Sequence, residues 1–287
     1  DSMSDLDSFL TYISEVKPDW VVLDGYQFSE AYERGIKQQG LSLLRVEDIP
    51  SMSYSADVLL NQNHGAEQMG YNVHPNTRLL TGLKYLLLRR EFRKALLEQK
   101  KFSEDAPFHI LISLGGGSQL CDSLNLKILQ ALSQLENWRG SATLIVGKMG
   151  TLSEQLTQLL TNISWPIEVL KQSDDMASEI LKADLAIVAG GSTMWELMSM
   201  QVPFLTLSLT EAQRDYLQFL EQEGLCDDLG WHEQVTPEKI LTSLLSLLQN
   251  APRRRKMLDT ANRLLCRESN GEELLRILST DVSVPYS

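Results

Sequence analysis

Residues 184–197, DLAIVAGGSTMWEL, decide the fold of this chain. The apolar run 185–189 suits a buried strand. Gly190 and Gly191 follow it at once, and a helix-forming segment begins at Thr193. A buried strand that turns through glycines into a helix is typical of an open parallel sheet, in which ligands bind at the carboxyl ends of the strands.

The same succession of strand, corner and helix recurs through the second half of the chain. Continuous apolar strands of this kind are buried on both faces by helices, so we predict a doubly wound α/β domain with a parallel sheet. The expected strands are FHILIS (108–113), ATLIVG (142–147), PIEVL (166–170), DLAIVA (184–189) and PFLTL (203–207), and the expected helices between them are 120–135, 152–160, 176–181 and 193–200. From residue 211 onward the pattern predicts helices alone, at 213–223, 237–249, 252–266 and 270–279.

The first part of the chain alternates helices and short apolar strands in the same way. We expect helices at 6–16 and 29–39 and strands at 20–24, 41–46 and 56–61. Residues 93–107 are charged and end in Pro107, which is typical of a linker. We therefore predict two domains, residues 1–100 and 101–287.

The composition is that of a globular protein with a sizeable core. Of the 287 residues, 43% are hydrophobic and 22% are charged, which suits two domains. The net charge of -12 argues against nonspecific binding to nucleic acid, which needs clustered cations. The one basic cluster, residues 253–256, follows Pro252 at a helix start. We expect it to be a solvated helix face, with a phosphate-binding patch as the alternative.

The cysteine pattern and the lengths of the apolar runs indicate the cellular compartment. Cys121, Cys226 and Cys266 show no CxxC spacing, so neither a disulfide framework nor a zinc site is predicted. The sequence has no bilayer-spanning run and no signal peptide, which favours a cytoplasmic location. Because it opens with Asp1 on the approach to a helix, we expect it to be part of a longer polypeptide.

Two glycine corners are the candidate ligand sites. In SLGGGSQ, Gly115, Gly116 and Gly117 would let a backbone approach a ligand without interference from Cβ atoms, and the next helix would offer N–H groups to an anion. The corners contain neither GxGxxG nor GxxxxGK[ST], which disfavours the dinucleotide fingerprint and the triphosphate loop. The alternative is that the glycines only form tight turns.

The second corner adds hydroxyl groups to the same geometry. After Gly190 and Gly191, Ser192 and Thr193 supply hydroxyls and backbone donors suited to phosphate oxygens. Glu196 lies one turn further, where a carboxylate would repel a phosphate unless it points sideways and accepts hydrogen bonds from a ribose diol. This predicts a nucleotide. An exposed, helix-favouring glutamate is the alternative for Glu196.

Polar residues also end the first strand of the chain. Asp24 is a candidate general base or hydroxyl acceptor, and Tyr26 a candidate group for orienting a substrate. Alternatively, Asp24 bonds loop backbone and Tyr26 is half-buried packing. Among the histidines, His109 begins a buried strand and is expected to be structural, and His64 is a weak catalytic candidate in a polar loop. No metal-binding spacing and no GxSxG elbow occur.

Six segments in one order carry a resemblance to a known family. They are VVLDGY (21–26), VEDI (46–49), ADVLLNQN (56–63), GLKYLLLRREF (82–92), ISLGGGS (112–118) and DLAIVAGGSTMWELM (184–198). The chain resembles the UDP-2,4-diacetamido-2,4,6-trideoxy-β-L-altropyranose hydrolases of pseudaminic acid biosynthesis. The resemblance implies a GT-B architecture, two Rossmann-like domains facing a cleft, and similarity to MurG-type glycosyltransferases in the C-terminal half.

The resemblance also implies roles for individual residues. Gly191, Ser192 and Thr193 match the corner near the diphosphate, Glu196 matches the carboxylate near the ribose, and Gly115 to Ser118 match the other wall of the nucleotide pocket.

In the first domain, Asp24 and Tyr26 match a D-x-Y element near the sugar. Arg89, Glu91 and Phe92 match an R-x-E-F segment that closes the first domain.

One departure bears on activity. The family carries an N-terminal GxGH segment whose histidine is the proposed catalytic base, and this sequence contains no GxGH. We therefore expect the first domain to be incomplete, with an open sheet edge, and the catalytic histidine to lie outside this sequence.

The resemblance implies that the intact enzyme releases UDP from a UDP-diacetamido-trideoxyhexose by attack of water at the anomeric carbon. It implies a UDP-sugar as the small-molecule partner and neither a metal nor another cofactor. The alternatives are a MurG-like glycosyltransferase, against which the chain lacks an obvious basic or amphipathic membrane-docking surface, and a noncatalytic nucleotide-sugar-binding module.

Overall fold

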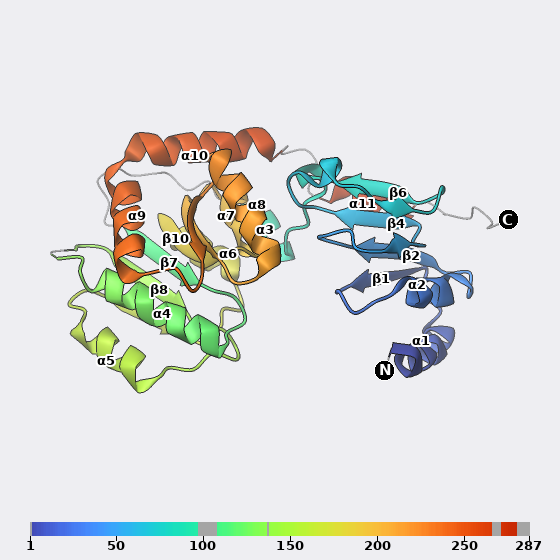
Figure 1. Ribbon diagram of the computed structural model, residues 1–287, viewed down its shortest axis with the longest axis horizontal. Coiled ribbons are helices and arrows are strands. Elements are labelled where there is room, and N and C mark those ends of the chain that lie inside the picture. The colour runs from blue at the N-terminus through green and yellow to red at the C-terminus, as the bar shows by residue number, and fades with distance from the viewer. Residues whose placement is uncertain (1, 97–107, 137, 266–270, 280–287) are drawn as a thin grey trace. The chain divides into compact units, whose positions relative to one another are not determined.

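The chain forms two compact units, drawn in Figure 1. The computed structural model describes residues 2–96, 108–136, 138–265 and 271–279. Within these, the first unit comprises residues 2–87 and 271–279, and the second unit comprises residues 88–265. Each unit is built on a parallel sheet, in agreement with the predicted GT-B-like α/β fold.

The first unit contains a four-stranded sheet in the order β1-β2-β4-β6, with every pair parallel. Its elements are α1 (Ser2–Val16), β1 (Trp20–Asp24), α2 (Glu30–Lys37), β2 (Ser42–Val46), β3 (Ser53–Tyr54), β4 (Val58–Asn61), β5 (Asn72–Val73), β6 (Arg78–Thr81) and α11 (Glu272–Ser279), with 3-10 turns at Ala66–Gln68 and Leu83–Tyr85. The two helices and three strands predicted before residue 62 are confirmed. β1 is the end strand of this sheet, and Val22 on it is 54% exposed.

Helices cover both faces of the first sheet. Residues of α1 and α2 pack with Val21, Leu23 and Leu43 on one face. On the other face, Leu274 and Ile277 of α11 pack with residues of β2, β4 and β6. The indole N–H of Trp20 also donates a hydrogen bond to the Leu278 carbonyl, at 3.0 Å. The last described helix of the chain therefore completes the core of the first unit.

The second unit contains a six-stranded parallel sheet in the order β12-β11-β10-β7-β8-β9. Its elements are α3 (Arg90–Ala95), β7 (His109–Ser113), α4 (Gln119–Leu132), β8 (Ser141–Ile145), α5 (Glu154–Asn162), β9 (Ile167–Leu170), α6 (Met176–Lys182), β10 (Leu185–Ala189), α7 (Thr193–Ser199), β11 (Phe204–Ser208), α8 (Glu211–Gln222), β12 (Asp227–Trp231), α9 (Pro237–Gln249) and α10 (Ala251–Leu264). The strand and helix succession predicted from residue 108 to 207 is confirmed.

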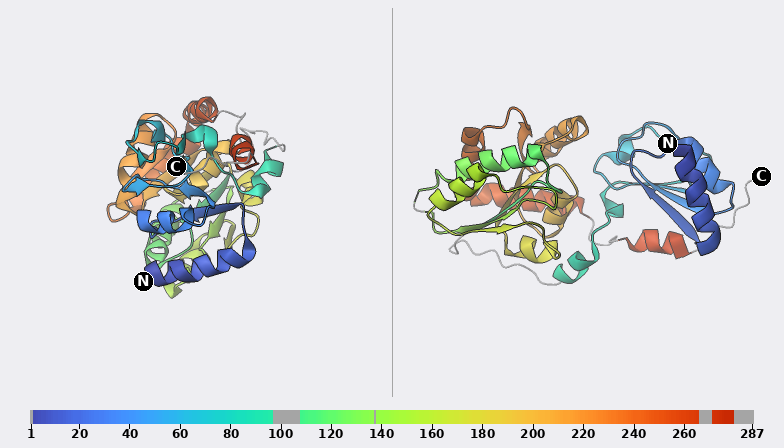
Figure 2. Two further views of the ribbon diagram at one scale, coloured as in Figure 1. Left: turned by 90° about the vertical axis from the view of Figure 1, so that its right-hand side faces the viewer. Right: turned by 90° about the horizontal axis from the view of Figure 1, so that it is seen from below.

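The continuous apolar strands are buried because helices lie on both faces of this sheet. One core cluster joins alternate strand residues, such as Ile110 and Ile112, to α4, α5 and α9. The view from below in Figure 2 places α4 and α6 on opposite faces. This follows from right-handed crossovers, since the chain moves outward from β7 through α4 and returns through α6.

One strand of the second unit contradicts the sequence-based prediction. The pattern after residue 211 was expected to be helical throughout, but Asp227–Trp231 forms β12, which pairs with β11. Two aspartates and Gly230 disfavour a strand in isolation. The end position of β12 tolerates them, because only one side of the strand is paired and the register with β11 shifts there.

The two units differ from the predicted division into residues 1–100 and 101–287. The units divide between Leu87 and Leu88, so Arg89, Glu91 and Phe92 belong to the second unit. The helix at the end of the chain belongs to the first unit, where the apolar side of α11 finds its partners. Residues 97–107, most of the predicted linker, lie outside the described residues.

The order of the second sheet places both glycine corners side by side. The chain leaves β7 toward β8 and later returns to β10, on the other side of β7. Val188 of β10 is level with Ser113 of β7, so the corners that follow these two strands are adjacent. This is the topological switch point, where open α/β sheets bind ligands.

Candidate functional site

The corner after β7 packs against the loop after β8. Gly117 has φ +85°, and a Cβ atom built on it would lie 2.3 Å from the backbone nitrogen of Gly150. Gly147 approaches the same corner, with its ideal Cβ 2.4 Å from the backbone nitrogen of Gly117. For Gly117 the structure therefore supports the alternative expectation, a glycine required by a tight turn.

Gly115 and Gly116 differ from Gly117 because their side-chain positions face open space. No heavy atom lies within 4 Å of the ideal Cβ of Gly115, and the nearest to that of Gly116 is the methyl of Met149, at 3.9 Å. Both residues are exposed, whereas Gly117 is buried. Gly115 also has φ +96°, a conformation that favours glycine. These two residues form an uncovered stretch of backbone at the carboxyl edge of the sheet.

The hydroxyl of Ser118 has a structural role. Its Oγ accepts a hydrogen bond from the Cys121 amide at 3.2 Å and so caps α4. The same hydroxyl donates to the Cys121 sulfur at 3.3 Å. The hydroxyl of Ser118 is therefore committed to the start of the helix, as is common for a serine at an N-cap.

The corner after β10 combines one packed and one open glycine. A Cβ atom on Gly190 would lie 2.8 Å from the side chain of Leu217, whereas nothing lies within 4 Å of that of Gly191. Ser192 is exposed and stands at the N-cap of α7, but its side chain makes no capping hydrogen bond. Thr193, half-buried, begins the helix. The Ser118 hydroxyl thus caps its helix, whereas the Ser192 hydroxyl does not.

Glu196 forms a two-point ion pair with Arg89. Arg89 Nε donates to Glu196 Oε1 at 2.8 Å, and Nη2 donates to Oε2 at 3.0 Å. The Glu196 side chain is only 6% exposed, whereas that of Arg89 is 49% exposed. The expectation of an exposed, helix-favouring glutamate is therefore wrong, because the residue is buried and paired.

The groups around Glu196 shift the pKa of its carboxyl in opposite directions. Burial raises the pKa of Glu196, Arg89 opposes the rise, and Glu91 adds to it. On its other side, Arg89 Nη1 lies 3.1 Å from Glu91 Oε1, and its guanidinium carbon lies 5.3 Å from the Phe92 ring centre. Arg89, which Glu91 and Phe92 contact in turn, thus binds Glu196, and all of these residues belong to the second unit. The sequence offered no signal for this contact, which joins residues 107 positions apart.

In the first unit, a polar cluster lies at the carboxyl ends of β1, β2 and β4. Tyr26 follows β1, and its phenol donates a hydrogen bond to Asp48 Oδ2 at 2.8 Å. Asn63 Nδ2 donates to Asp48 Oδ1, also at 2.8 Å. Asn61, fully buried, donates to the Asp48 backbone carbonyl at 2.9 Å. Asp48 lies in the VEDI segment but was not predicted as a site residue, because its partners Tyr26 and Asn63 come from other loops.

The cluster changes the description of the two predicted sugar-side residues. Tyr26 is 74% exposed, so half-buried packing does not describe it. Its pKa is raised to about 12, mainly by the hydrogen bond to Asp48, with burial and the charges of Asp48, Glu47 and Asp24 adding to the rise. Asp24, the last residue of β1, is exposed on the same edge. Both side chains are thus accessible to a solute.

His109 is a structural residue, as the sequence predicted. Its ring nitrogens lie 2.8 Å from Ser141 Oγ and 3.0 Å from Thr143 Oγ1, so it is a structural residue between β7 and β8. His64 is half-buried in the turn after β4, next to Asn63. Its catalytic role stays a prediction.

The basic cluster of residues 253–256 is only partly a solvated face. Arg254 is 3% exposed, and its guanidinium donates to the carbonyls of Leu247 and Leu248 at the end of α9. Arg253 pairs with the buried carboxylate of Asp227. The prediction is wrong for Arg254, because the turn between α9 and α10 directs this side chain to the helix end, where unpaired carbonyls attract a cation.

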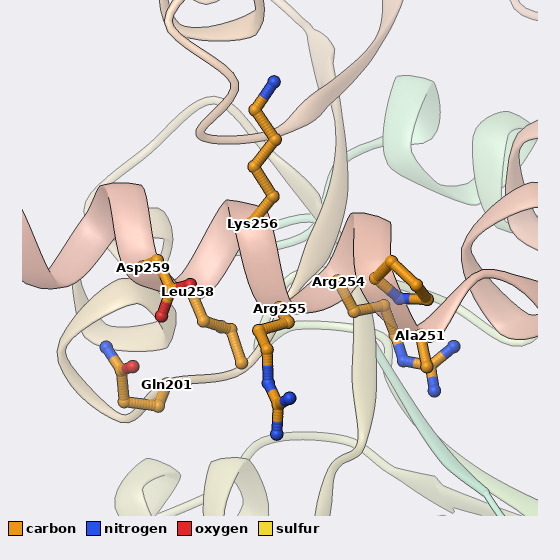
Figure 3. Close-up of a pocket in the computed structure, with 8 residues that line it drawn as sticks. Gln201, Ala251, Arg254, Arg255, Lys256, Leu258 and Asp259 are labelled. Carbon is orange, nitrogen blue, oxygen red and sulfur yellow. The ribbon is translucent and has the colours of Figure 1, made fainter.

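A hollow of about 520 Å³ lies along α10 and is lined by Gln201, Arg255, Leu258 and Asp259, among others (Figure 3). Gln201 connects α7 to β11 and so lies at the amino end of the sheet. The glycine corners lie at the opposite, carboxyl edge. The hollow is therefore separate from the candidate site.

Most of the second unit matches the model of a known protein family. Residues 111–270 match the model of the glycosyltransferase family 28 C-terminal domain. The chain belongs to this family. The match includes both glycine corners and Glu196, and the fold around them is the GT-B-like fold.

Curated relatives of this family 28 chain are longer than it is. It is 30% identical over 206 residues to the spore coat polysaccharide biosynthesis protein SpsG of Bacillus subtilis, covering 71% of this chain and 59% of that protein. It is 28% identical over 235 residues to the uncharacterized protein MJ1062 of Methanocaldococcus jannaschii, covering 77% of this chain and 48% of that protein. The chain thus spans about half of the length of these relatives.

Solved structures show the same fold over nearly the whole chain. MurG of Acinetobacter baumannii is 19% identical with a TM-score of 0.66, covering 96% of this chain and 77% of that one. MnaA of S. aureus, solved with UDP, is 13% identical with a TM-score of 0.64, covering 96% of this chain and 77% of that one. At these identities, the similarity establishes the fold alone.

Two structural features are absent from the described residues. None of the helices there is both long and apolar enough to cross a membrane. No three His, Cys, Asp or Glu side chains gather there in a way that would hold a metal ion.

Proposed function

We propose that this family 28 chain binds the UDP moiety of a nucleotide sugar at the carboxyl edge of its second unit. We propose further that the enzyme containing it hydrolyses a UDP-diacetamido-trideoxyhexose in nonulosonic, pseudaminic-type, acid biosynthesis. The resemblance described above supports this reaction, and the family membership supports a nucleotide sugar as the substrate class.

The observation that carries the proposal is the pair of adjacent glycine corners at the switch point of the sheet. Gly115, Gly116 and Gly191 each leave the position of a side chain empty, so a ligand can approach their backbone closely. Ser192 adds a hydroxyl that does not cap its helix. A diphosphate, with acceptor oxygens on both phosphorus atoms, matches two open corners set side by side, each followed by the N-terminus of a helix.

The nucleotide assignment rests on Glu196 and on the relatives. An ionised carboxylate accepts hydrogen bonds and donates none, which suits the two hydroxyls of a ribose. The structures of MnaA with UDP and of the Neisseria meningitidis epimerase with UDP-GlcNAc make UDP the first nucleotide to test. For the hexose we keep Asp24 and Tyr26 of the first unit as the proposed contacts, so the first unit would serve the sugar and the second unit the UDP.

In the proposed reaction, water attacks the anomeric carbon, the bond from that carbon to the diphosphate oxygen breaks, and UDP leaves with the bonding electrons. Donors fixed at the corners would stabilise the negative charge that develops on the leaving oxygen. A histidine outside this sequence would take the proton from the water.

Glycosyl transfer is the second candidate. The Syntrophotalea carbinolica relative, 26% identical over 144 residues, is an N-acetylglucosamine transferase, and the family itself is named for glycosyltransferases. The same leaving group would depart, but an acceptor hydroxyl would take the place of water.

Two measurements test the proposal. Titration calorimetry with UDP should show binding by the chain, and Glu196→Ala should weaken it by about 1 to 3 kcal/mol. In the full-length protein, UDP-diacetamido sugars in oxygen-18 water should release UDP without an acceptor, with the label on the sugar. Release that requires an acceptor would favour the transferase, and absence of UDP binding would overturn the proposal.

A further inference from the structure

We propose that Arg89 is a positioning residue that fixes the Glu196 carboxylate for the ribose of the bound nucleotide and so gives the site its preference for a hydroxylated sugar. This inference rests on the proposed function, because it assigns a role to Arg89 within the same nucleotide site. Arg89 would act through Glu196 and would not itself contact the reacting atoms.

The geometry of the pair is that of a fixed support. Arg89 uses two donors, Nε at 2.8 Å and Nη2 at 3.0 Å, for the two oxygens of Glu196. Such a two-point contact fixes the plane of the carboxylate as well as its position, which one ammonium group could not do. A glutamate side chain otherwise has three rotatable bonds, so an unsupported Glu196 would lose alignment with any diol.

Arg89 is held on its other sides as well. Its remaining terminal nitrogen pairs with Glu91 at 3.1 Å, and its guanidinium carbon lies 5.3 Å from the ring centre of Phe92, which is fully buried. Two ion pairs and one contact with an aromatic ring thus anchor the Arg89 side chain. These contacts favour an Arg89 side chain that stays in place when the ligand binds, since a side chain that must move away for the ligand would be expected to make few contacts.

The pairing leaves Glu196 able to accept further hydrogen bonds. An ionised carboxylate has about four lone-pair sites, and Arg89 occupies one on each oxygen. The remaining pair of sites matches the two hydroxyls of a ribose. A buried carboxylate also needs a cation nearby to remain ionised, and Arg89 supplies one to a side chain that is 6% exposed.

The chain offers a matched control on another edge of the same unit. Arg253 pairs with Asp227, and the two side chains are 41% and 8% exposed, close to the 49% and 6% of Arg89 and Glu196. Asp227 begins β12, at the amino edge of the sheet. Arg253→Met therefore removes an equivalent ion pair without touching the glycine corners.

The experiment compares UDP with 2′,3′-dideoxy-UDP by titration calorimetry on the wild-type chain, Arg89→Met, Arg89→Lys and Arg253→Met. We expect the wild type and Arg253→Met to prefer UDP by at least about tenfold, from two hydrogen bonds to a charged acceptor. Arg89→Met should lower this ratio to within about twofold of unity, while its affinity for the dideoxy compound changes by less than about threefold. Arg89→Lys, which restores the charge alone, should give an intermediate ratio.

Other outcomes would overturn the inference. If Arg89→Met keeps the wild-type ratio, or binds UDP more tightly than the wild type, Arg89 does not position Glu196. Should Arg89→Met fail to fold, the ratio of Arg89→Lys decides in its place, and a ratio equal to the wild type rejects the two-point support. If the wild type binds UDP but shows no preference for it over the dideoxy compound, this inference is rejected and the proposed UDP site stands. If the wild type does not bind UDP at all, the proposed function is rejected together with this inference.

Discussion

Gly117 and Gly150 touch through their backbones, and no side chain fits between them. A Cβ atom on Gly117 would lie 2.3 Å from the Gly150 nitrogen, and the backbone of Gly117 has φ +85°. Gly191, in the neighbouring corner, has nothing within 4 Å of its side-chain position. Two glycines predicted for the same role thus differ in their surroundings, since Gly117 is packed against backbone and Gly191 faces open space.

Alanine at these two positions should separate stability from binding. Gly117→Ala forces a contact with backbone and a disfavoured φ, so we expect it to lower the free energy of unfolding by about 2 to 4 kcal/mol. Gly191→Ala should change that free energy by no more than about 0.5 kcal/mol. Because its methyl group would stand where the diphosphate is proposed to lie, it should weaken UDP binding about tenfold.

Urea denaturation and titration calorimetry on both variants check this pair. Equal destabilisation by the two alanines would contradict the structure of the corners. Unchanged UDP affinity in a folded Gly191→Ala chain would remove that corner from the proposed site.

The sequence predicted the elements of this fold better than their long-range contacts. Apolar runs such as 185–189 predicted their strands, because burial on both faces leaves a clear local pattern. β12 was missed, since Asp227, Asp228 and Gly230 carry no strand pattern and pair only because β11 lies beside them. The corner glycines were recognised, but only the packing against Gly150 and Leu217 shows which of them face open space.

Charged residues were the hardest to predict, because their partners come from distant positions. Arg89 and Glu196 are 107 residues apart, and neither sequence segment specifies the other. Arg254 lies in a basic run that is typical of a solvated face, yet the turn before α10 buries it against the end of α9. The helical pattern near the end of the chain was clear, but not that α11 joins the first unit.

Arg254 should contribute to stability far more than its neighbour Arg255. Arg254→Met removes a buried charged donor from the Leu247 and Leu248 carbonyls, which we expect to lower the free energy of unfolding by about 2 to 4 kcal/mol. Arg255 is exposed, so Arg255→Met should change it by less than about 0.5 kcal/mol. Urea denaturation of the two variants measures this difference, and equal effects would refute the capping role of Arg254.

Tyr26 should titrate at unusually high pH. Its pKa is raised from 10.0 to about 12, chiefly by the hydrogen bond to Asp48, with Glu47 and Asp24 adding negative charge nearby. Because the folded state holds this proton more tightly than the unfolded state, the stabilisation is present below pH 10 and is lost as the pH rises toward 12. Asp48→Asn should move the titration back toward the ordinary value.

The tyrosinate absorbance of the wild type minus that of Tyr26→Phe isolates this one phenol among the 8 tyrosines. A difference titration with the ordinary pKa in the wild type, or one that Asp48→Asn leaves in place, would contradict the hydrogen bond between Tyr26 and Asp48.

Replacing Arg89 with lysine should raise the pH at which the ribose preference is lost. Burial raises the pKa of Glu196, Glu91 adds to the rise, and Arg89 is the cation that opposes it. In Arg89→Met the pKa of Glu196 should therefore rise further, so the carboxylate takes up a proton at a higher pH than in the wild type. The ratio of UDP to 2′,3′-dideoxy-UDP affinity should then fall toward unity as the pH decreases, beginning at higher pH in Arg89→Lys than in the wild type, whereas in Arg89→Met it should stay within about twofold of unity throughout. Using the ratio cancels the titration of the terminal phosphate, which both nucleotides share and whose pKa is about 6. Calorimetry over a pH series measures the ratio, and curves that coincide for the wild type and both variants would show that Arg89 does not control the charge of Glu196.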